Sequence, residues 1–233
     1  MIHTVYSSTY NSSSLSSSSS SSFSSSRCVA IRHAISATKA GADMISMDGF
    51  DCGGHPGEED VGNWVLLAKA ASALSIPFVA SGGCANGRQL AAALALGAEG
   101  MNMGTRFMAT VEAPIHQNIK DALVRTDERG TTHIFRTVSN TERVFKNAQS
   151  AKVIAIEAEH PGDFGKIHHL VRGELYRQSF QETGDTENSV WSCGQSIGLI
   201  DDIPTCKDLV ATIVDEAEDI IRVRLASKLV SKL

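Results

Sequence analysis

Between residues 29 and 103 the chain alternates segments of helical spacing with short apolar segments. In the first kind, at residues 29–41, 61–75 and 87–97, apolar side chains recur every three or four positions. The second kind, at residues 43–48, 76–81 and 99–103, has the length of buried strands. Strands that alternate with helices predict successive βα units, and therefore a parallel sheet covered by helices.

The predicted helices have recognisable ends and faces. Gly41 and Gly97 stop the first and third segments. The helix at 61–75 is predicted to bury an apolar stripe made of Trp64, Leu67, Ala68, Ala71 and Leu74. A last helix begins after Thr205, which is a suitable N-cap residue. Its apolar stripe comprises Leu209, Val210, Ile213, Val214, Ala217, Ile220 and Ile221.

Two of the predicted strands run into glycine turns. Gly82 and Gly83 follow one strand, and Gly104 and Thr105 follow the next. Ligands of parallel sheets bind at the carboxyl ends of the strands, and glycine lets backbone N–H groups approach an anion closely. The pattern therefore indicates a phosphate site. Ordinary turns in which glycine supplies a positive φ explain it as well, so both interpretations remain open.

A histidine follows the first predicted strand, in the stretch "MDGFDCGGHPGEEDVG". His55 comes directly after two glycines, at the end of the sheet where ligands bind, and an imidazole there can exchange a proton at neutral pH. A plain surface histidine is the alternative. A second alternative is a metal site of His55 with Glu58, Glu59 and Asp60. A third leaves these acids in water at the start of the next helix.

Composition narrows the class of protein. The chain is 42% hydrophobic with a net charge of -5, which provides one sizeable core and argues against a nucleic-acid partner. No apolar run approaches the ~20 residues of a membrane span, so we expect a soluble protein without a membrane partner. The five cysteines are scattered and form no CxxC pair, which favours a reduced, cytoplasmic setting.

The N-terminal part has an unusual composition. Serine occupies fifteen of the twenty positions from Ser7 to Ser26, too many for the tract to bury apolar surface. We therefore predict that residues 1–26 are disordered and that ordered structure begins near Cys28. A Ser-rich transit peptide is the alternative, although no Arg-rich amphipathic pattern accompanies the tract.

Three motifs together carry a family resemblance. The segments "DGFDCGGHPGEED", "IPFVASGGCANGRQLAAALALGAEGMNMGTRFMAT" and "WSCGQSIGLIDD" resemble the FMN-dependent nitronate monooxygenases, formerly called 2-nitropropane dioxygenases. The likeness runs in order from about Arg27 to the C-terminus. Relatives of that family include NADH:quinone reductases and a flavin-dependent enoyl reductase, so the motifs indicate the family more closely than the reaction.

The resemblance assigns roles to particular residues. It implies a TIM barrel with FMN at its mouth and His55 as the catalytic residue over the flavin. The residues implied to bind FMN are Arg27, Val79, Ala80, Ser81, Gly82, Gly83, Gly104 and Thr105. Among these, Val79 and Ala80 would line the approach to the ring. Arg27 stands where relatives carry the lysine of a His-Lys-Cys triplet, which here reads Ser26-Arg27-Cys28.

The resemblance also implies a division of the chain. Residues 27–113 would form a partial FMN-binding barrel, residues 114–180 an inserted α/β segment on the substrate side, and residues 181–233 a return to the barrel with a C-terminal helix. This leaves far fewer barrel residues than the ~250 of a complete (β/α)8 barrel. We therefore expect an incomplete TIM barrel of about the last three βα units, which binds FMN weakly or not at all.

The implied reaction is the oxidation of an alkyl nitronate, or of a nitroalkane deprotonated by His55, to a carbonyl compound and nitrite. FMN and O2 would serve as cofactor and oxidant. One alternative is quinone reduction by NADH on the same flavin. Another is a catalytically inactive fragment that binds a partner through its exposed half-sheet.

Overall fold

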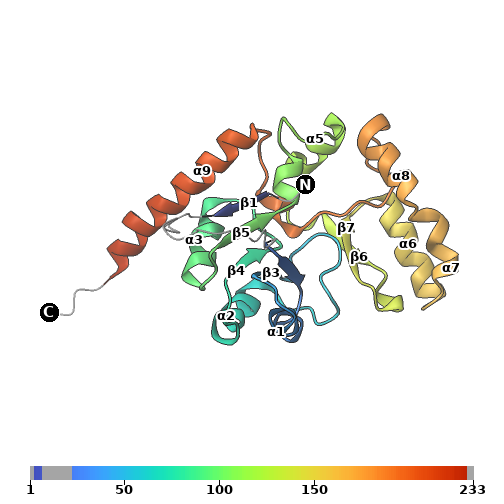
Figure 1. Cartoon of the computed structure of the whole chain (residues 1–233). Coiled ribbons are helices and arrows are strands. Elements are labelled where there is room, and N and C mark those ends of the chain that lie inside the picture. Colours follow the sequence, from blue (N-terminus) through green and yellow to red (C-terminus); the bar gives the residue numbers. More distant parts are fainter. Residues whose placement is uncertain (1–2, 7–22, 230–233) are drawn as a thin grey trace, which may run out of the picture.

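An open five-stranded sheet lies at the centre of the computed structural model, which describes residues 3–6 and 23–229 (Figure 1). The order is β1-β5-β4-β3-β2. The strands are β1 (His3–Tyr6), β2 (Ser25–Cys28), β3 (Met44–Asp48), β4 (Phe78–Ser81) and β5 (Gly100–Met103). Strands β2 to β5 are parallel, and β1 pairs antiparallel with β5. The predicted α/β fold with a parallel sheet is confirmed.

Three helices connect the parallel strands in the predicted order. They are α1 (Ile31–Lys39), α2 (Asn63–Ala73) and α3 (Gly87–Ala95). Gly41 and Gly97, which were predicted to stop two of them, have φ angles of 97° and 95°. These left-handed conformations favour glycine and follow the last helical turn, as the sequence indicated.

The prediction for residues 1–26 is wrong at both ends of that range. Ser25 and Ser26 belong to β2, which pairs in parallel with β3, and β1 also lies within the range. Parallel pairing uses backbone groups, so a serine-rich composition does not prevent it. The sheet therefore has four parallel strands rather than the three expected. The rest of the serine tract, residues 7–22, lies outside the described residues.

The two faces of the sheet differ in chemistry because side chains alternate along each strand. One face packs against the helices and contributes Cys28, Ile45, Met47, Phe78, Ala80, Met101 and Met103 to the main hydrophobic core. The opposite face carries Arg27, Ser46, Asp48, Ser81 and Asn102. The helices thus cover an apolar face, and the polar groups of the sheet are collected on the other.

The long helix α9 (Cys206–Asp219) packs against α3. Thr205 caps it, as predicted, by accepting a hydrogen bond from the backbone N–H of Asp208 at 3.1 Å. Of the predicted stripe, Leu209, Ile213 and Ala217 are buried.

The face predicted for α2 is wrong in part. Its buried residues are Leu66, Leu67 and Ala70, whereas Trp64 is 75% exposed. The helix is rotated relative to the prediction so that two adjacent leucines enter the core. Large aromatic residues do not decide the buried face by themselves when a neighbouring aliphatic pair fits the core better.

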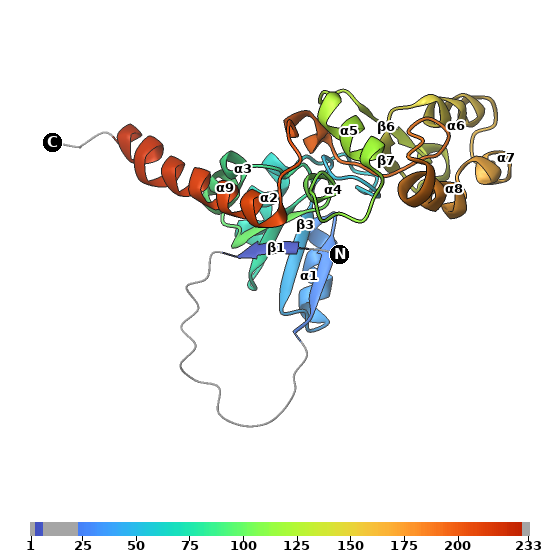
Figure 2. The same ribbon diagram turned by 90° about the horizontal axis from the view of Figure 1, so that it is seen from above.

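A second group of elements lies beside the sheet, at the side away from α9 (Figures 1 and 2). Its centre is the antiparallel β6–β7 pair, flanked by helices. The elements are α4 (Thr105–Met108), α5 (Gln117–Arg125), β6 (Thr131–Ile134), β7 (Glu142–Phe145), α6 (Ala148–Glu159), α7 (Phe164–Ile167) and α8 (Gly173–Gln178). Among the described residues, no helix has the length and apolar character needed to cross a membrane.

The close approach of α3 and α9 gives a test of the packing. A Cβ added at Gly87 would lie 2.5 Å from the carbonyl oxygen of Ile213 and 2.7 Å from the backbone nitrogen of Ala217. We expect Gly87→Ala to lower the free energy of unfolding by about 1–3 kcal/mol through overpacking. The matched control is Gly173→Ala in α8, where an added Cβ meets nothing within 4 Å. Urea unfolding measures both variants, and equal stabilities would contradict the close helix contact.

Candidate functional site

A cavity of about 240 Å³ lies at the carboxyl ends of the parallel strands, and we call it the strand-end cavity. Four strands and the turns that follow β4 and β5 contribute to it. Its lining includes Arg27, Asp48, Ser81, Gly82, Gly83, Asn102, Gly104 and Thr105, together with Gly53 and Gly194. The structure therefore brings together six of the residues that the sequence pointed to, namely Arg27, Ser81, Gly82, Gly83, Gly104 and Thr105.

A polar network runs across the floor of this cavity. Asp48, which is 2% exposed, forms an ion pair with Arg27 and accepts a hydrogen bond from the Ser46 hydroxyl at 3.3 Å. The Asn102 side-chain amide donates to the Ser81 hydroxyl at 3.2 Å. No role was predicted for Asp48 or Asn102. Each is a polar residue in a predicted strand that is otherwise largely apolar, and this was the signal in the sequence.

The charge at the cavity comes from Arg27 and its partner Asp48. Burial acts to lower the pKa of Arg27, but the Asp48 carboxylate raises it overall, so the guanidinium stays charged. Burial, and then the charge of Asp48, raise the pKa of the nearby Cys52 thiol to about 11. The thiol is therefore neutral at pH 7, and the charged groups at the cavity are the paired arginine and aspartate.

The glycines of the two turns serve different purposes. Gly82 and Gly83 have φ angles of 84° and 70°, and an added Cβ at either would lie 2.7 Å from the β-carbon of Cys52 or of Asp51. They are required by the turn and by its packing against the preceding loop. At Gly104, by contrast, an added Cβ meets nothing within 4 Å. The missing side chain of Gly104 therefore leaves open space at the cavity.

The two residues predicted to line the approach to a flavin ring lie elsewhere. Val79 and Ala80 are each 1% exposed, and neither lines the strand-end cavity. Val79 is on the polar face of the sheet, whereas Ala80 faces the helices because side chains alternate along β4. Thr105, which was predicted to bind the phosphate, does line the cavity, and its hydroxyl accepts a hydrogen bond from the Gly194 N–H at 2.8 Å.

His55 also lies outside the strand-end cavity. Its exposed side chain lines a neighbouring cavity of about 250 Å³ together with Val29 and His33, while Gly53 lines the strand-end cavity. The positive φ of Gly54, at 77°, turns the chain between the two. The His55 loop thus borders both cavities, through the imidazole in one case and through Gly53 in the other.

The acids after His55 bind protein groups. Glu58 accepts hydrogen bonds from Thr141, Glu59 forms an ion pair with Arg32, and Asp60 forms one with Arg136. Within the part of the chain that the structure describes, no cluster of three or more potential ligands could hold a metal ion. The acids thus neither build the alternative metal site nor begin the next helix. The acid that does contact that helix start is Asp51, which accepts from the Asn63 N–H at 3.0 Å.

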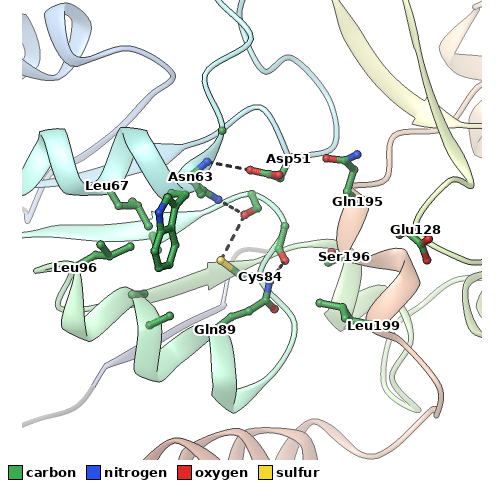
Figure 3. Close-up of a pocket in the computed structure, with 17 residues that line it drawn as sticks. Asp51, Asn63, Leu67, Cys84, Gln89, Leu96, Glu128, Gln195, Ser196 and Leu199 are labelled. Atoms are coloured by element: carbon green, nitrogen blue, oxygen red, sulfur yellow. Dashed lines mark hydrogen bonds between the residues drawn. The ribbon is translucent and has the colours of Figure 1, made fainter. Parts of the chain in front are cut away.

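A larger cavity of about 430 Å³ lies on the other side of the Gly82–Gly83 turn (Figure 3). Much of its wall is apolar and includes Trp64, Leu67, Leu96 and Leu199. Two amides of its wall hold the turn: the Asn63 side chain donates to the carbonyl oxygen of Ser81 at 2.9 Å, and that of Gln89 donates to the carbonyl oxygen of Gly83 at 2.5 Å. The residues on this side therefore hold the Gly82–Gly83 turn in its conformation.

His133, which packs against the His55 loop, is expected to make the stability of the protein depend on pH. His133 stacks on Phe50 at 4.7 Å, and its Nε2 is buried without a hydrogen-bond partner. Burial, followed by the charges of Arg143 and Arg136, lowers the pKa of His133 to about 4. An unfolded histidine titrates near 6.5. The neutral ring therefore stabilises the fold fully above pH ~6.5, and this contribution is lost as the pH falls toward 4.

We expect His133→Gln to make the free energy of unfolding less dependent on pH between about 6.5 and 4. Urea unfolding at several pH values in this window measures the slope for the original and variant chains. His33→Gln is the control, because that residue is outside the Phe50 stack. Parallel slopes for all three chains would contradict a depressed pKa at His133.

The chain is similar to a known family and to several known proteins. The family model described as nitronate monooxygenase matches residues 10–216. The chain is 33% identical to (3aS,4S,5R,7aS)-5-hydroxy-7a-methyl-1-oxo-octahydro-1H-indene-4-carboxyl-CoA dehydrogenase of Rhodococcus jostii (strain RHA1), over 81% of this chain and 62% of the relative. It is 29% identical to the nitronate monooxygenase of Neurospora crassa, over 82% of this chain and 53% of the relative.

A solved structure of FabK from Thermotoga maritima superposes with a TM-score of 0.81 at 33% sequence identity. The match covers 88% of this chain and 63% of FabK. In these three comparisons the chain spans between about half and two thirds of the length of the protein it matches.

Proposed function

Because the chain belongs to the nitronate monooxygenase family, we propose that it forms part of an FMN-dependent oxidoreductase that holds the cofactor phosphate in the strand-end cavity. One observation supports this most directly. Six of the residues that the family resemblance assigns to FMN line that single cavity, although they come from three separate strands and their turns. The family and its relatives are flavin-dependent oxidoreductases, which is the class of chemistry the proposal uses.

The chemistry of the cavity fits the phosphate of FMN and the part of the cofactor attached to that phosphate. Gly104 leaves open space, the backbone of the two turns borders it, and Arg27 supplies a positive charge. At about 240 Å³ the cavity is smaller than the ~300–1,000 Å³ of most ligand pockets. It therefore suits one end of FMN. The four parallel strands correspond in this proposal to the last four of a (β/α)8 barrel, whose other strands would contact the rest of the cofactor.

The proposed reaction is the oxidation of a nitronate to a carbonyl compound and nitrite, with O2 as oxidant. FMN, when bound, supplies the electron-accepting chemistry of this reaction. The turns at Gly82–Gly83 and Gly104–Thr105 would hold the phosphate, and Arg27, which is paired with Asp48, is the cation next to it. His55 takes the proton from the carbon next to the nitro group when the substrate arrives as a nitroalkane. The loop that carries His55 borders the strand-end cavity through Gly53.

A second candidate is the oxidation of a coenzyme A thioester at the same flavin. The observation that favours it is the similarity to the Rhodococcus jostii dehydrogenase, which at 33% exceeds the 29% identity to the Neurospora crassa nitronate monooxygenase. Both reactions begin with removal of a proton from a carbon beside an electron-withdrawing group. The same imidazole can serve either substrate, so the substrate has to be determined by assay.

The FMN site is tested by filling the open space at Gly104. We expect the chain to bind FMN weakly and Gly104→Ala to reduce the affinity roughly tenfold, about 1.4 kcal/mol. The melting temperature without FMN should stay the same, because the added Cβ has room. Titration of flavin fluorescence measures binding, with Gly173→Ala as control. Equal affinities for the two variants, or no FMN binding by the original chain, would contradict the site.

The role of His55 is tested by its replacement. We expect His55→Asn to abolish nitrite formation from a nitroalkane while FMN affinity is unchanged, since the side chain lies outside the strand-end cavity. Parallel assays with a coenzyme A thioester and a chemical electron acceptor decide between the two candidate substrates. Undiminished nitroalkane turnover by the variant would exclude His55 as the proton acceptor.

A further inference from the structure

The loop that carries His55, residues 49–62, is fastened to the β6–β7 pair. Gly54 and Arg143 exchange two backbone hydrogen bonds, at 3.1 and 2.7 Å. The Arg143 side chain, which is 2% exposed, donates to the carbonyl oxygen of Phe50 at 2.8 Å and lies over the Phe50 ring at 4.9 Å. These contacts fix the path of the loop before His55, because Arg143 holds it both at Phe50 and at Gly54.

A further contact reaches the imidazole itself. The Nδ1 atom of His55 lies 3.1 Å from the carbonyl oxygen of Thr141. A carbonyl oxygen only accepts hydrogen bonds, so Nδ1 must carry the hydrogen and the neutral ring has its lone pair on Nε2. Within the described residues Nε2 makes no hydrogen bond, and the side chain is exposed. The nitrogen that can accept a proton is thus the one open to an incoming molecule.

The Thr141 peptide is in turn held by a carboxylate. The Thr141 N–H donates to Oε1 of Glu58 at 2.7 Å, and its hydroxyl donates to Oε2 at 2.6 Å. Thr141 is 1% exposed, so this orientation is set inside the protein. Hydrogen bonds to a charged acceptor are stronger than neutral ones. Both oxygens of Glu58 are therefore engaged in aiming the residue whose carbonyl receives the His55 hydrogen.

We propose that Glu58 is a positioning residue that acts through Thr141 to hold His55 in the Nδ1–H tautomer, with Nε2 as the proton acceptor. The inference rests on the proposed role of His55 in proton removal. The arrangement follows the general logic of a base oriented by a third group, here with a backbone carbonyl between the carboxylate and the ring. Of the other acids of the loop, Glu59 and Asp60 pair with arginines, and Asp51 accepts a hydrogen bond from the Asn63 N–H.

The first test reads the tautomer and needs neither flavin nor turnover. Long-range ¹H–¹⁵N NMR correlations on the ¹⁵N-histidine-labelled chain show which ring nitrogen carries the hydrogen, and His55→Asn identifies the signal. We expect the Nδ1–H form in the original chain and a large Nε2–H fraction in Glu58→Ala. Asp60→Ala is the matched control, because it removes a different anchor of the same loop.

An Nε2–H tautomer in the original chain, or no change in Glu58→Ala, would overturn the proposal. An equal change in Asp60→Ala would also overturn it, since loop anchoring alone would then explain the effect. If Glu58→Ala fails to fold, Thr141→Val serves instead: it removes only the hydroxyl bond to Oε2 and should shift the same equilibrium in the same direction.

The second test uses the two forms of the proposed substrate. Glu58→Ala should lower kcat/KM for a nitroalkane roughly tenfold, because proton removal depends on the tautomer. Turnover of a preformed nitronate, which has already lost that proton, should be unchanged. Equal losses on both substrates would contradict the positioning role. Absence of turnover by every chain, with the NMR result intact, would reject the proposed function and leave the tautomer assignment standing.

Discussion

The parallel pairing of β3, β4 and β5 is the constraint on which the candidate site depends. It aligns Asp48 with Ser81 and Ser81 with Asn102, so that the last polar residue of each strand lies on the same face. Because side chains alternate, the same register sends Met47, Ala80 and Met101 into the core. A shift of one residue would bury the polar row and expose the apolar one, so the core enforces the geometry of the site.

The parts of the structure that depend on local pattern could be predicted from the sequence. The alternation of helices and strands, the glycine stops at Gly41 and Gly97, and the cap at Thr205 all follow from short-range chemistry. The gathering of Arg27 with the two glycine turns was also predictable, although through a family resemblance. In each case the determining residues lie close together in the chain or occur at the ends of neighbouring strands.

What the sequence could not supply was set by distant contacts. The direction of His55 depends on Gly54 and its pairing with Arg143, which lies in β7 on a different sheet. Nothing in the pattern around His55 indicates that partner. The strand at Ser25–Cys28 likewise exists because β3 offers it a pairing edge, while its serines suggested disorder. The buried face of α2 was also set by distant contacts. The core accommodates Leu66 and Leu67, and Trp64 is left exposed.

The open side of the sheet gives Arg27 a further significance. Within the described residues β2 pairs only with β3, so its other edge has backbone groups available to a strand of another molecule. Proteins discourage such edge-to-edge association by placing a charged side chain on the outermost strand. Arg27 lies on this outermost strand, with its side chain half exposed and its guanidinium paired with Asp48 of the neighbouring strand. The same charged side chain therefore lines the cavity and stands on the strand from which a barrel would continue.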